Sequence, residues 1–434
     1  MNIKKRLPLL FIFTLVTNYF IFAGASDMEP VTSAKSLALG GYYYAGYDDI
    51  TAAYNNPAGI LSFAGSGFAI NLNGRAGRQL CEQSEYDLHR SFRATDYSGS
   101  AGIYWVPTSK LGFALLYNRA IDYSLDWPLA MSFNVKGTER LYGLHVTSRC
   151  RVDALSPAIA LRLGSLSLGF AGNLYNVYKK FGFPVGNLNW ESNSANPIYL
   201  MKQEMQGTAI GWSVGFNYPL TSKLEIGGIL RSGYTRNLSG DAETDLFFDL
   251  DSLAKKTSIE SEFQMPFSGG LGILYKVTEQ LSFNLDITTQ LWENTLSHYE
   301  FNYEDTAWTN RMPDAARDSI TGYYWQKMPL NFENSLDVSI GLEYDTNKDL
   351  KYRCGYRFSK TPNSNQTYSL LFPDVNQHWF SAGIGFTYDN YLIDLSLAYS
   401  FGIASNIKET EDPYFYGEYD TRTILPSINV EYKF

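Results

Sequence analysis

The residue types that most often carry chemistry are sparse in this sequence. Its four histidines are far apart and do not stand at a metal-ligand spacing: His89, His145, His298 and His378. No serine-centred elbow and no phosphate-cradling glycine loop is present. Ser381 and His378 are three residues apart, so on one strand they point to opposite faces. We therefore predict a protein that is not an enzyme, with no cofactor and no metal.

One acidic stretch could bind calcium. It contains Asp241, Glu243 and Asp245, followed by Asp249 and Asp251. The spacing differs from that of an EF-hand loop, and the alternative interpretation is a solvated loop. The net charge of −9 is spread over such segments rather than gathered in a tail, which argues against a nucleic-acid partner.

A second polar stretch, residues 48–61 (DDITAAYNNPAGIL), fits neither the helix nor the strand period. Asparagine accepts turn conformations and bonds its own backbone, whereas proline fixes φ and removes a hydrogen-bond donor. We therefore predict a rigid turn formed by five residues: Asn55, Asn56, Pro57, Ala58 and Gly59.

The chain begins with the features of a secretory signal peptide. Basic residues 4–6 precede an apolar run over residues 7–22, and residues 23–25 (AGA) offer a small-x-small cleavage site. The apolar run falls short of the roughly twenty residues that a membrane-spanning helix needs. We expect residues 1–25 to be removed on export.

The rest of the chain has the composition of a membrane barrel. Aromatic residues make up 16% and charged residues only 18% of the sequence. Apolar and polar residues alternate in 281–288 (LSFNLDIT) and in 391–399 (YLIDLSLAY), which is typical of strands with one face toward lipid. A third alternating stretch covers residues 350–358, where apolar side chains share one face. Lys351, Arg353 and Arg357 share the other face, which predicts a wet or ligand-facing lumen.

The same alternation predicts about fourteen strands, joined by short and long connections in turn. They cover residues 67–75, 98–106, 111–119, 153–163, 165–176, 207–219, 223–236, 257–276, 281–291, 330–345, 349–359, 377–389, 391–402 and 422–434. Short turns and long outer loops are typical of an up-and-down barrel. The predicted fold is all-β: a transmembrane antiparallel up-and-down β-barrel over residues 66–434.

A barrel of this size needs something inside it. Side chains fill a barrel of about eight strands, whereas sixteen to eighteen strands leave an aqueous channel. We therefore predict that residues 26–65 form an N-terminal hatch that plugs the lumen and contains the turn at Asn56 and Pro57.

Five segments are distinctive: residues 40–41 (GG), 48–49 (DD), 56–58 (NPA), 265–272 (MPFSGGLG) and, most specifically, 372–383 (FPDVNQHWFSAG). Through these segments, most of the mature chain resembles the FadL/TodX family of outer-membrane transporters of long-chain fatty acids and other hydrophobic compounds. The resemblance implies a fourteen-stranded barrel in which Asn56, Pro57 and Ala58 are hatch residues. The first two segments also resemble a related branch, typified by PorV, that works in protein secretion in Bacteroidetes.

Together these observations predict an outer-membrane channel of a Gram-negative bacterium for passive uptake of hydrophobic compounds such as fatty acids. The ligand would be captured at the outer loops, bound in the lumen and released when the hatch moves. Two alternatives stay open: a barrel that binds protein cargo in a secretion system, and a general porin. We expect contacts with outer-membrane lipid, lipopolysaccharide and the barrel-assembly machinery, no nucleic-acid partner, and a monomer.

Two predicted outer loops, residues 177–206 and the loop after residue 236, carry more apolar residues than a solvated loop should expose. Such a patch is typical of a binding groove. Six of these residues are the predicted ligand-capture residues: Phe181, Phe183, Trp190, Leu246, Phe247 and Leu250. Alternatively, they pack against one another and close the barrel mouth.

The cysteines predict one disulfide bond. Cys81 and Cys150 fall in the first and second predicted outer loops, and export places both in an oxidising compartment. A bond requires their Cα atoms to approach within about 7 Å. Cys354 is predicted to face lipid.

The last strand carries the predicted assembly signal. Ile428, Val430, Tyr432 and Phe434 share one face of that strand, and the chain ends on an aromatic carboxylate. Tyr432 and Phe434 are the residues that the barrel-assembly machinery would read.

Overall fold

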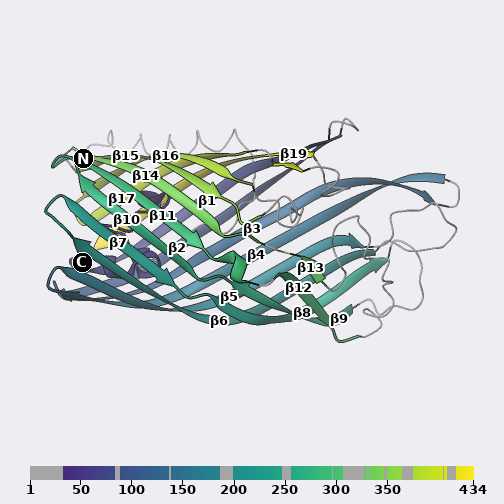
Figure 1. Ribbon diagram of the computed structural model, residues 1–434, viewed down its shortest axis with the longest axis horizontal. Helices are drawn as coiled ribbons and strands as arrows, with labels where there is room; N and C mark the ends of the chain where they lie inside the picture. The colour runs from purple at the N-terminus through teal and green to yellow at the C-terminus, as the bar shows by residue number, and fades with distance from the viewer. Residues whose placement is uncertain are drawn as a thin grey trace, which may run out of the picture.

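The computed structural model describes residues 33–83, 88–135, 138–185, 199–246, 256–295, 297–305, 327–329, 332–346, 349–363, 375–403, 405–407 and 417–434. Most of them lie in one antiparallel sheet (Figure 1). Its strands are β1 (Gly65–Gln83), β2 (Leu88–Thr108), β3 (Leu111–Val135), β4 (Thr138–Leu163), β5 (Leu166–Val185), β6 (Tyr199–Pro219), β7 (Leu224–Arg231), β8 (Tyr234–Leu246), β9 (Lys256–Met265), β10 (Ser268–Lys276), β11 (Leu281–Gln290), β12 (His298–Tyr303), β13 (Lys327–Pro329), β14 (Ser335–Asp345), β15 (Leu350–Lys360), β16 (Gln377–Tyr388), β17 (Tyr391–Gly402), β18 (Ser405–Ile407) and β19 (Gly417–Lys433).

The sheet closes into a barrel because β1 pairs with both β2 and β19. Five of the nineteen strands continue the strand before them after a short break: β8 continues β7, and β10, β12, β14 and β18 continue β9, β11, β13 and β17. The barrel therefore has fourteen antiparallel strands around its wall. This confirms the predicted fold class.

The two ends of the barrel differ. At one end, turns of two to four residues join the strands at the six predicted places, and they lie at the left in Figure 1. One of them contains Gly164, whose φ of 64° suits the tight turn of a two-residue hairpin. At the other end β1 to β6 run much further than predicted: β4 begins at Thr138 and β5 ends at Val185.

These extensions correct the loop assignments. Cys81 lies in β1 and Cys150 in β4, and much of the predicted loop 177–206 belongs to β5 and β6. The alternation of apolar and polar residues ends where the wall leaves the bilayer, because both faces of a strand can then be polar. Backbone pairing continues beyond that point without a sequence signal.

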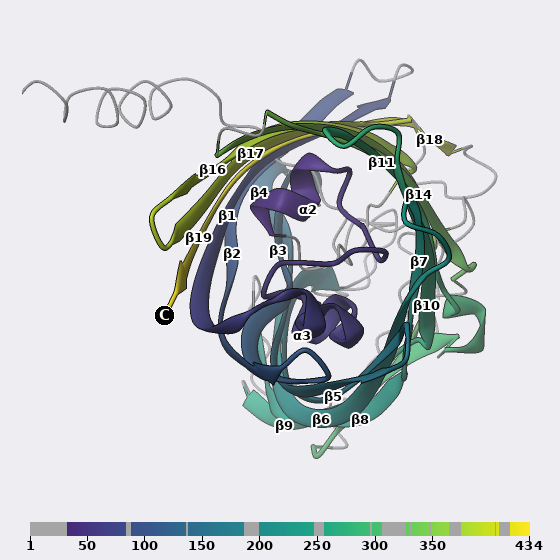
Figure 2. The ribbon, with the colours of Figure 1, turned by 90° about the vertical axis from the view of Figure 1, so that its left-hand side faces the viewer.

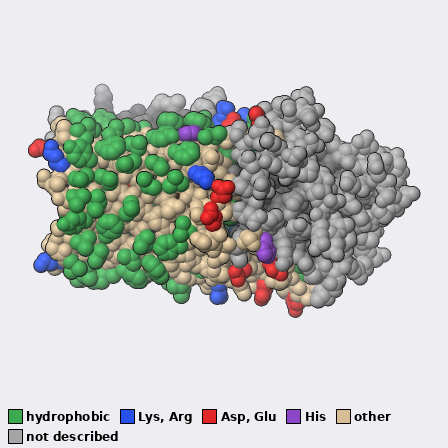
Figure 3. Space-filling model, viewed as in Figure 1, with side chains coloured by type: hydrophobic (Ala, Val, Ile, Leu, Met, Phe, Trp, Pro, Cys, Tyr) green, Lys and Arg blue, Asp and Glu red, His purple; other side chains and the backbone are tan. Residues whose placement is uncertain are grey.

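Within the bilayer-sized part of the wall, the predicted alternation is confirmed. On β1, Phe68, Ile70 and Leu72 are exposed on the outside, while Ala69 and Asn71 between them are buried. Figure 3 shows hydrophobic side chains over most of this part of the surface, with charged side chains at its two ends. Apolar atoms outside and polar atoms inside are what a lipid-embedded barrel requires.

The chain before β1 lies inside the barrel (Figure 2). It forms α2 (Ala34–Ala38), α3 (Ala52–Asn55) and the 3-10 helix η2 (Pro57–Ser62). From Ser33 to Leu61, every residue except Gly46 and Asp48 is buried. We call residues 33–64 the lumenal segment. Among the described residues, none of the helices has the length and apolarity needed to span a bilayer.

Candidate ligand-binding lumen

The predicted Asn-Asn-Pro turn is the junction between two short helices. Asn56 ends α3 and is the N-cap of η2, where its side chain accepts a hydrogen bond from the backbone N–H of Ala58 at 3.3 Å. Pro57 occupies the first position of η2, where a missing N–H costs nothing. The segment stays out of the sheet as predicted, but its conformation is helical rather than that of a simple turn.

The Asn56 side chain also connects the lumenal segment to the wall. Its amide nitrogen donates to the backbone carbonyl of Tyr44 at 2.7 Å and to that of Phe216 on β6 at 3.2 Å. Asn56 is fully buried, so an unpaired polar atom here would cost about 1–3 kcal/mol. One side chain therefore joins two parts of the lumenal segment to β6.

Glycines in the wall permit this close contact. A Cβ atom added to Gly215 on β6 would lie 2.1 Å from the Asn56 side-chain oxygen. One added to Gly169 on β5 would lie 2.2 Å from the backbone of Ala58. Both distances are far below van der Waals contact, so no other residue fits these two wall positions with the segment in place.

The other side of the lumenal segment is held by charges. Lys35 on α2 places its Nζ atom 2.5 Å from Asp48 and 3.6 Å from Glu343 on β14. Glu343 accepts from Arg353 on β15 at 2.6 Å, and the same guanidinium donates to Asp394 on β17 at 2.6 Å. We call these five residues the charge network.

Burial alone would lower the pKa of Lys35. The carboxylates of Asp48 and Glu343 raise it by more, so the pKa lies above its usual range and Lys35 is charged at neutral pH. A buried ammonium group with two carboxylate neighbours is stable, whereas either partner alone would be costly to bury.

A second carboxylate organises the lumenal segment from within. Asp49 accepts hydrogen bonds from the hydroxyls of Ser33 at 2.5 Å and Tyr43 at 2.6 Å, and from the backbone N–H of Thr51 at 2.8 Å. Burial raises the pKa of Asp49, while these hydrogen bonds act in the opposite direction. The contacts hold the start of α2 against the start of α3.

Two tyrosines attach the middle of the lumenal segment to the wall. The hydroxyl of Tyr42 donates to Asp337 on β14 at 3.1 Å. The backbone N–H of Tyr44 donates to Asp286 on β11 at 2.7 Å, and its hydroxyl lies 2.9 Å from Thr288. Burial is the main cause that raises the pKa of both tyrosines, so their phenols stay protonated.

A cavity of about 60 Å³ lies between the lumenal segment and the wall. The lumenal segment contributes Tyr42, Tyr44, Tyr54 and Asn55 to its lining. The wall contributes apolar side chains and tyrosines, including Ile121, Val152, Tyr175, Ile229, Tyr234 and Met265. One water molecule needs a cavity of at least about 10–15 Å³. The present cavity is several times larger, which is enough for a small ring or a segment of an alkyl chain.

Arg231 on β7 supplies the charge in this cavity. Its guanidinium lies 3.8 Å from the centre of the Tyr54 ring, and its Nη2 atom donates to the Tyr54 carbonyl at 2.8 Å. The Nε atom of Arg231 is buried and has no hydrogen-bond partner in the described part of the chain. A guanidinium has five donors in a planar fork suited to a carboxylate.

Aromatic rings continue from the cavity toward the loop end. Tyr175 stacks on Tyr234 with 4.4 Å between ring centres, and Tyr234 lies 6.1 Å from Phe263 on β9. Further along, Phe181 on β5 contacts Phe301 on β12 at 6.3 Å. We call these five residues the aromatic column; all are buried inside the barrel.

The predicted site residues meet different outcomes. The turn residues Asn55 to Gly59 are buried in the lumen, and Asn55 lines the cavity. Phe181 lies within β5 and not in a loop, and it is buried in the aromatic column. Leu246 ends β8. The side chains of Phe183 and Leu246, and the whole of Trp190, Phe247 and Leu250, lie outside the described residues.

The predicted disulfide stays a prediction. Cys150 is buried, and the side chain of Cys81 lies outside the described residues. Strands β2 and β3 separate β1 from β4, and adjacent strands are about 4.8 Å apart. The bond would therefore require the wall to bend where β2 and β3 are no longer paired. Cys354 is exposed on the outer face, as predicted.

The other chemical candidates do not assemble into a site in the described part of the chain. Asp241 and Glu243 face Lys256 at 3.0 and 3.6 Å, which favours the solvated-segment interpretation of the acidic stretch. Ser381 donates to the Ala38 carbonyl inside the lumen, whereas His378 contacts Tyr356 and Phe401. Sequence reasoning missed Arg231 and Lys35, since neither belongs to a motif.

Comparison with known proteins identifies the family. The model of the family described as "Outer membrane protein transport protein (OMPP1/FadL/TodX)" matches residues 14–434. The chain belongs to this family. It is thus an outer-membrane barrel of the FadL/TodX type, from a family that transports hydrophobic compounds, as predicted.

Relatives within the FadL/TodX family are distant in sequence. The chain is 22% identical to a long-chain fatty acid transport protein of Escherichia coli O6:H1, over 90% of this chain and 81% of that protein. It is 23% identical to the protein of that name from Salmonella typhi, over 52% of this chain but only 49% of that protein.

Two solved structures of the FadL/TodX family share the fold. A Pseudomonas aeruginosa FadL homologue superposes with a TM-score of 0.74 at 14% identity, covering 94% of this chain and 100% of that one. The toluene transporter TodX of Pseudomonas putida gives 0.71 at 16% identity, with the same coverage.

Proposed function

We propose that this barrel carries small hydrophobic molecules inward along the aromatic column to the cavity, and that the lumenal segment is a hatch that must shift for release. The observation that carries the proposal is the cavity itself, because the wall and the lumenal segment both line it. A ligand bound there touches the element that blocks its exit. Passive transport of this kind needs no energy source.

The lining favours a ligand that is mostly apolar and has one polar end. Tyrosine rings and aliphatic side chains surround the cavity, and Arg231 is part of its lining. The Escherichia coli relative is named for long-chain fatty acids and TodX for toluene. An acid would use both parts of this cavity, whereas a hydrocarbon would use only the apolar part.

Capture at the outer end is the second part of the proposal. Phe181 lies in the aromatic column on the side of the loop end. In the sequence, Trp190 follows β5, and Phe247 and Leu250 follow β8. These apolar residues would deliver the ligand to Phe181. Replacing Phe247 and Leu250 with Ser should slow uptake and leave the barrel folded.

Uptake measurements test the proposal. We expect cells that produce the Tyr234→Ala variant to take up radiolabelled oleate or toluene about tenfold more slowly than cells with the wild type, because a buried aromatic contact of about 1.5 kcal/mol is lost. Arg231→Met should slow oleate but spare toluene, since only the acid has a carboxylate to bind.

The matched control is Tyr352→Ala, which removes a tyrosine of β15 that is 50% exposed on the outside of the barrel. Its uptake should equal that of the wild type when equal amounts of folded barrel are present. If Tyr234→Ala and Tyr352→Ala behave alike for both compounds, the lumen is not the route and the proposal is wrong.

A further inference from the structure

The backbone register pairs arginine positions on three adjacent strands of the barrel wall. The register places Arg78 on β1 directly opposite Arg422 on β19, and the same Arg78 directly opposite Arg93 on β2. Like charges at directly opposite positions destabilise a sheet. A barrel that keeps this arrangement needs a source of negative charge nearby.

The wall faces lipid along these strands. On β1, Phe68, Ile70 and Leu72 are exposed, and Arg78 follows them at the same parity. On β19, Arg422 is exposed, and the outward positions below it include Ile424 and Pro426. The arginine row therefore lies directly above an apolar strip that belongs to the lipid-facing surface.

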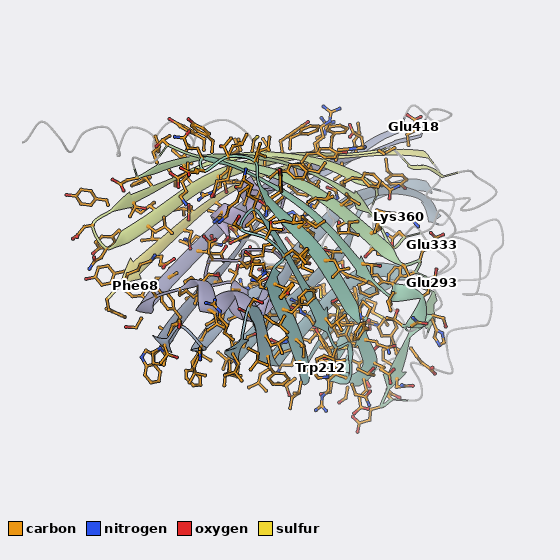
Figure 4. All side chains as sticks on the ribbon, turned by 60° about the vertical axis from the view of Figure 1, so that its left-hand side comes forward. Phe68, Trp212, Glu293, Glu333, Lys360 and Glu418 are labelled. Atoms are coloured by element: carbon orange, nitrogen blue, oxygen red, sulfur yellow. The ribbon has the colours of Figure 1, made fainter. Side chains whose placement is uncertain are left out.

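The height of the row corresponds to the outer membrane interface. Phe68 lies toward the turn end of the barrel (Figure 4). Glu418, which precedes Arg422 by four residues on the same strand, lies toward the loop end. Ten residues separate Phe68 from Arg78, which is about 33 Å along a strand, or roughly 25 Å along the barrel axis at a tilt of about 40°. That is about the height of the apolar band of such barrels.

The charge of the row is only partly compensated. Asp420 accepts from the Nε and Nη2 atoms of Arg422 at 3.0 and 2.8 Å. Within the described part of the chain, Arg78 has no ion-pair partner. Guanidinium groups bind phosphate in a planar, two-pronged geometry that a lysine ammonium does not offer.

We infer that this face binds a phosphate-bearing glycolipid of the outer leaflet, of the lipid A type. Its phosphate would lie between Arg78 and Arg422, and its acyl chains would cover Leu72, Ile424 and Pro426. The loop end of an outer-membrane barrel faces outward, so this row meets the outer leaflet. The site is on the outside of the wall and is independent of transport through the lumen.

Native mass spectrometry of the full-length folded barrel in detergent tests the inference, with lipid A that carries both phosphates as the probe. We expect the Arg78→Ala/Arg422→Ala variant to bind it about tenfold more weakly than the wild type, which corresponds to about 1.4 kcal/mol. Arg78→Lys/Arg422→Lys should recover part of the affinity. Lipid A stripped of its phosphates should bind the wild type as weakly as the intact lipid binds the alanine variant.

The charge-matched control is Lys110→Ala/Lys223→Ala, which removes two exposed lysines at the turn end and should leave binding unchanged. Phosphatidylglycerol, an anionic phospholipid, should compete poorly. Equal binding by the wild type and the alanine variant would overturn the inference, as would equal binding of lipid A with and without phosphate. The second comparison uses only the wild type, so it decides the question even if the alanine variant fails to fold.

Discussion

The two halves of the lumenal segment contact the barrel in different ways. Residues 33–49 contact β14 to β17 and also β7 and β11, and ion pairs through Lys35, Glu343 and Arg353 add to their packing against the wall. Residues 50–64 face β4 to β6 and are held by backbone contacts so close that the wall needs Gly169 and Gly215. Both halves pack closely on wall glycines, since a Cβ added to Gly355 on β15 would lie 2.3 Å from the Gly40 nitrogen. The first half differs in its buried ion pairs, which water can replace when the segment shifts. We therefore infer that the first half is the one that moves.

The chain between α2 and Tyr44, within the first half, suits such a movement. Gly40 and Gly41 follow α2 with φ angles of 96° and 105°, a region that other residues rarely adopt. Asn56 stays bound to Phe216 on β6 and to the Tyr44 carbonyl. A shift of α2 would displace Tyr42, which lines the cavity, while Tyr54 remains in place.

The largest effect should come from Arg353→Met. This change leaves the buried Asp394 without its cation and removes one of the three cationic partners of Glu343, a loss that costs about 3–5 kcal/mol for a buried pair. We expect a large fall in the thermal unfolding temperature and a higher ion conductance in planar bilayers, because the first half loses its anchor.

The control for this change is Lys256→Ala. Lys256 pairs with Asp241 on the surface, where both side chains are more than half exposed. Such pairs contribute about 0–1 kcal/mol, so neither the unfolding temperature nor the conductance should change. Equal behaviour of the two variants would mean that the charge network does not hold the hatch.

A smaller effect is expected from Asn56→Ala in the second half. The buried carbonyl of Tyr44 would lose its donor, at a cost of about 1–3 kcal/mol. The unfolding temperature should fall, but the conductance should stay low, since the close backbone packing against β5 and β6 remains. A conductance as high as that of Arg353→Met would refute the difference between the halves.

Much of this arrangement could be predicted from the sequence. The alternation in 281–288 predicted which side chains of β11 face the lumen, and it thereby placed Asp286 inside the barrel. The inner-face position of Arg353 was equally clear. Its partners were not, because Glu343 and Asp394 come from strands whose register is set by the closed sheet. Arg231 was missed because the cavity forms where β7 and β9 are interrupted, and no periodicity marks such a break.

The smallest expected effect concerns pH. The pKa of Asp49 is higher in the folded protein than in the unfolded chain, where it is 3.8. The protonated carboxyl group therefore adds to the stability of the fold below pH 3.8, and this contribution is lost as the pH rises through the folded-state pKa. Lowering the pH from 7 to 4 should therefore stabilise the wild type relative to Asp49→Asn. Thermal unfolding of both proteins at the two pH values measures this; an identical pH response would show that Asp49 does not titrate with folding.

The movement of the first half can be tested directly with two engineered disulfides in a background without the native cysteines. A Cβ added to Gly341 would lie 3.0 Å from the Leu39 Cβ, and one added to Gly112 would lie 2.9 Å from Cγ2 of Ile60. The Cβ atoms of a disulfide lie about 3.5–4.5 Å apart, so the first pair requires the two backbones to separate by about 0.5–1 Å. In the second pair, Cγ2 of Ile60 marks the place that a sulfur atom on that residue would take. Leu39→Cys/Gly341→Cys would therefore lock the first half to β14, and Ile60→Cys/Gly112→Cys would lock the second half to β3.

Uptake of radiolabelled oleate should be measured for both variants under oxidising conditions and again after reduction. We predict that the first disulfide stops uptake and that reduction restores it, whereas the second leaves uptake unchanged in both states. Undiminished uptake with the Leu39–Gly341 bond fully formed would contradict a moving first half.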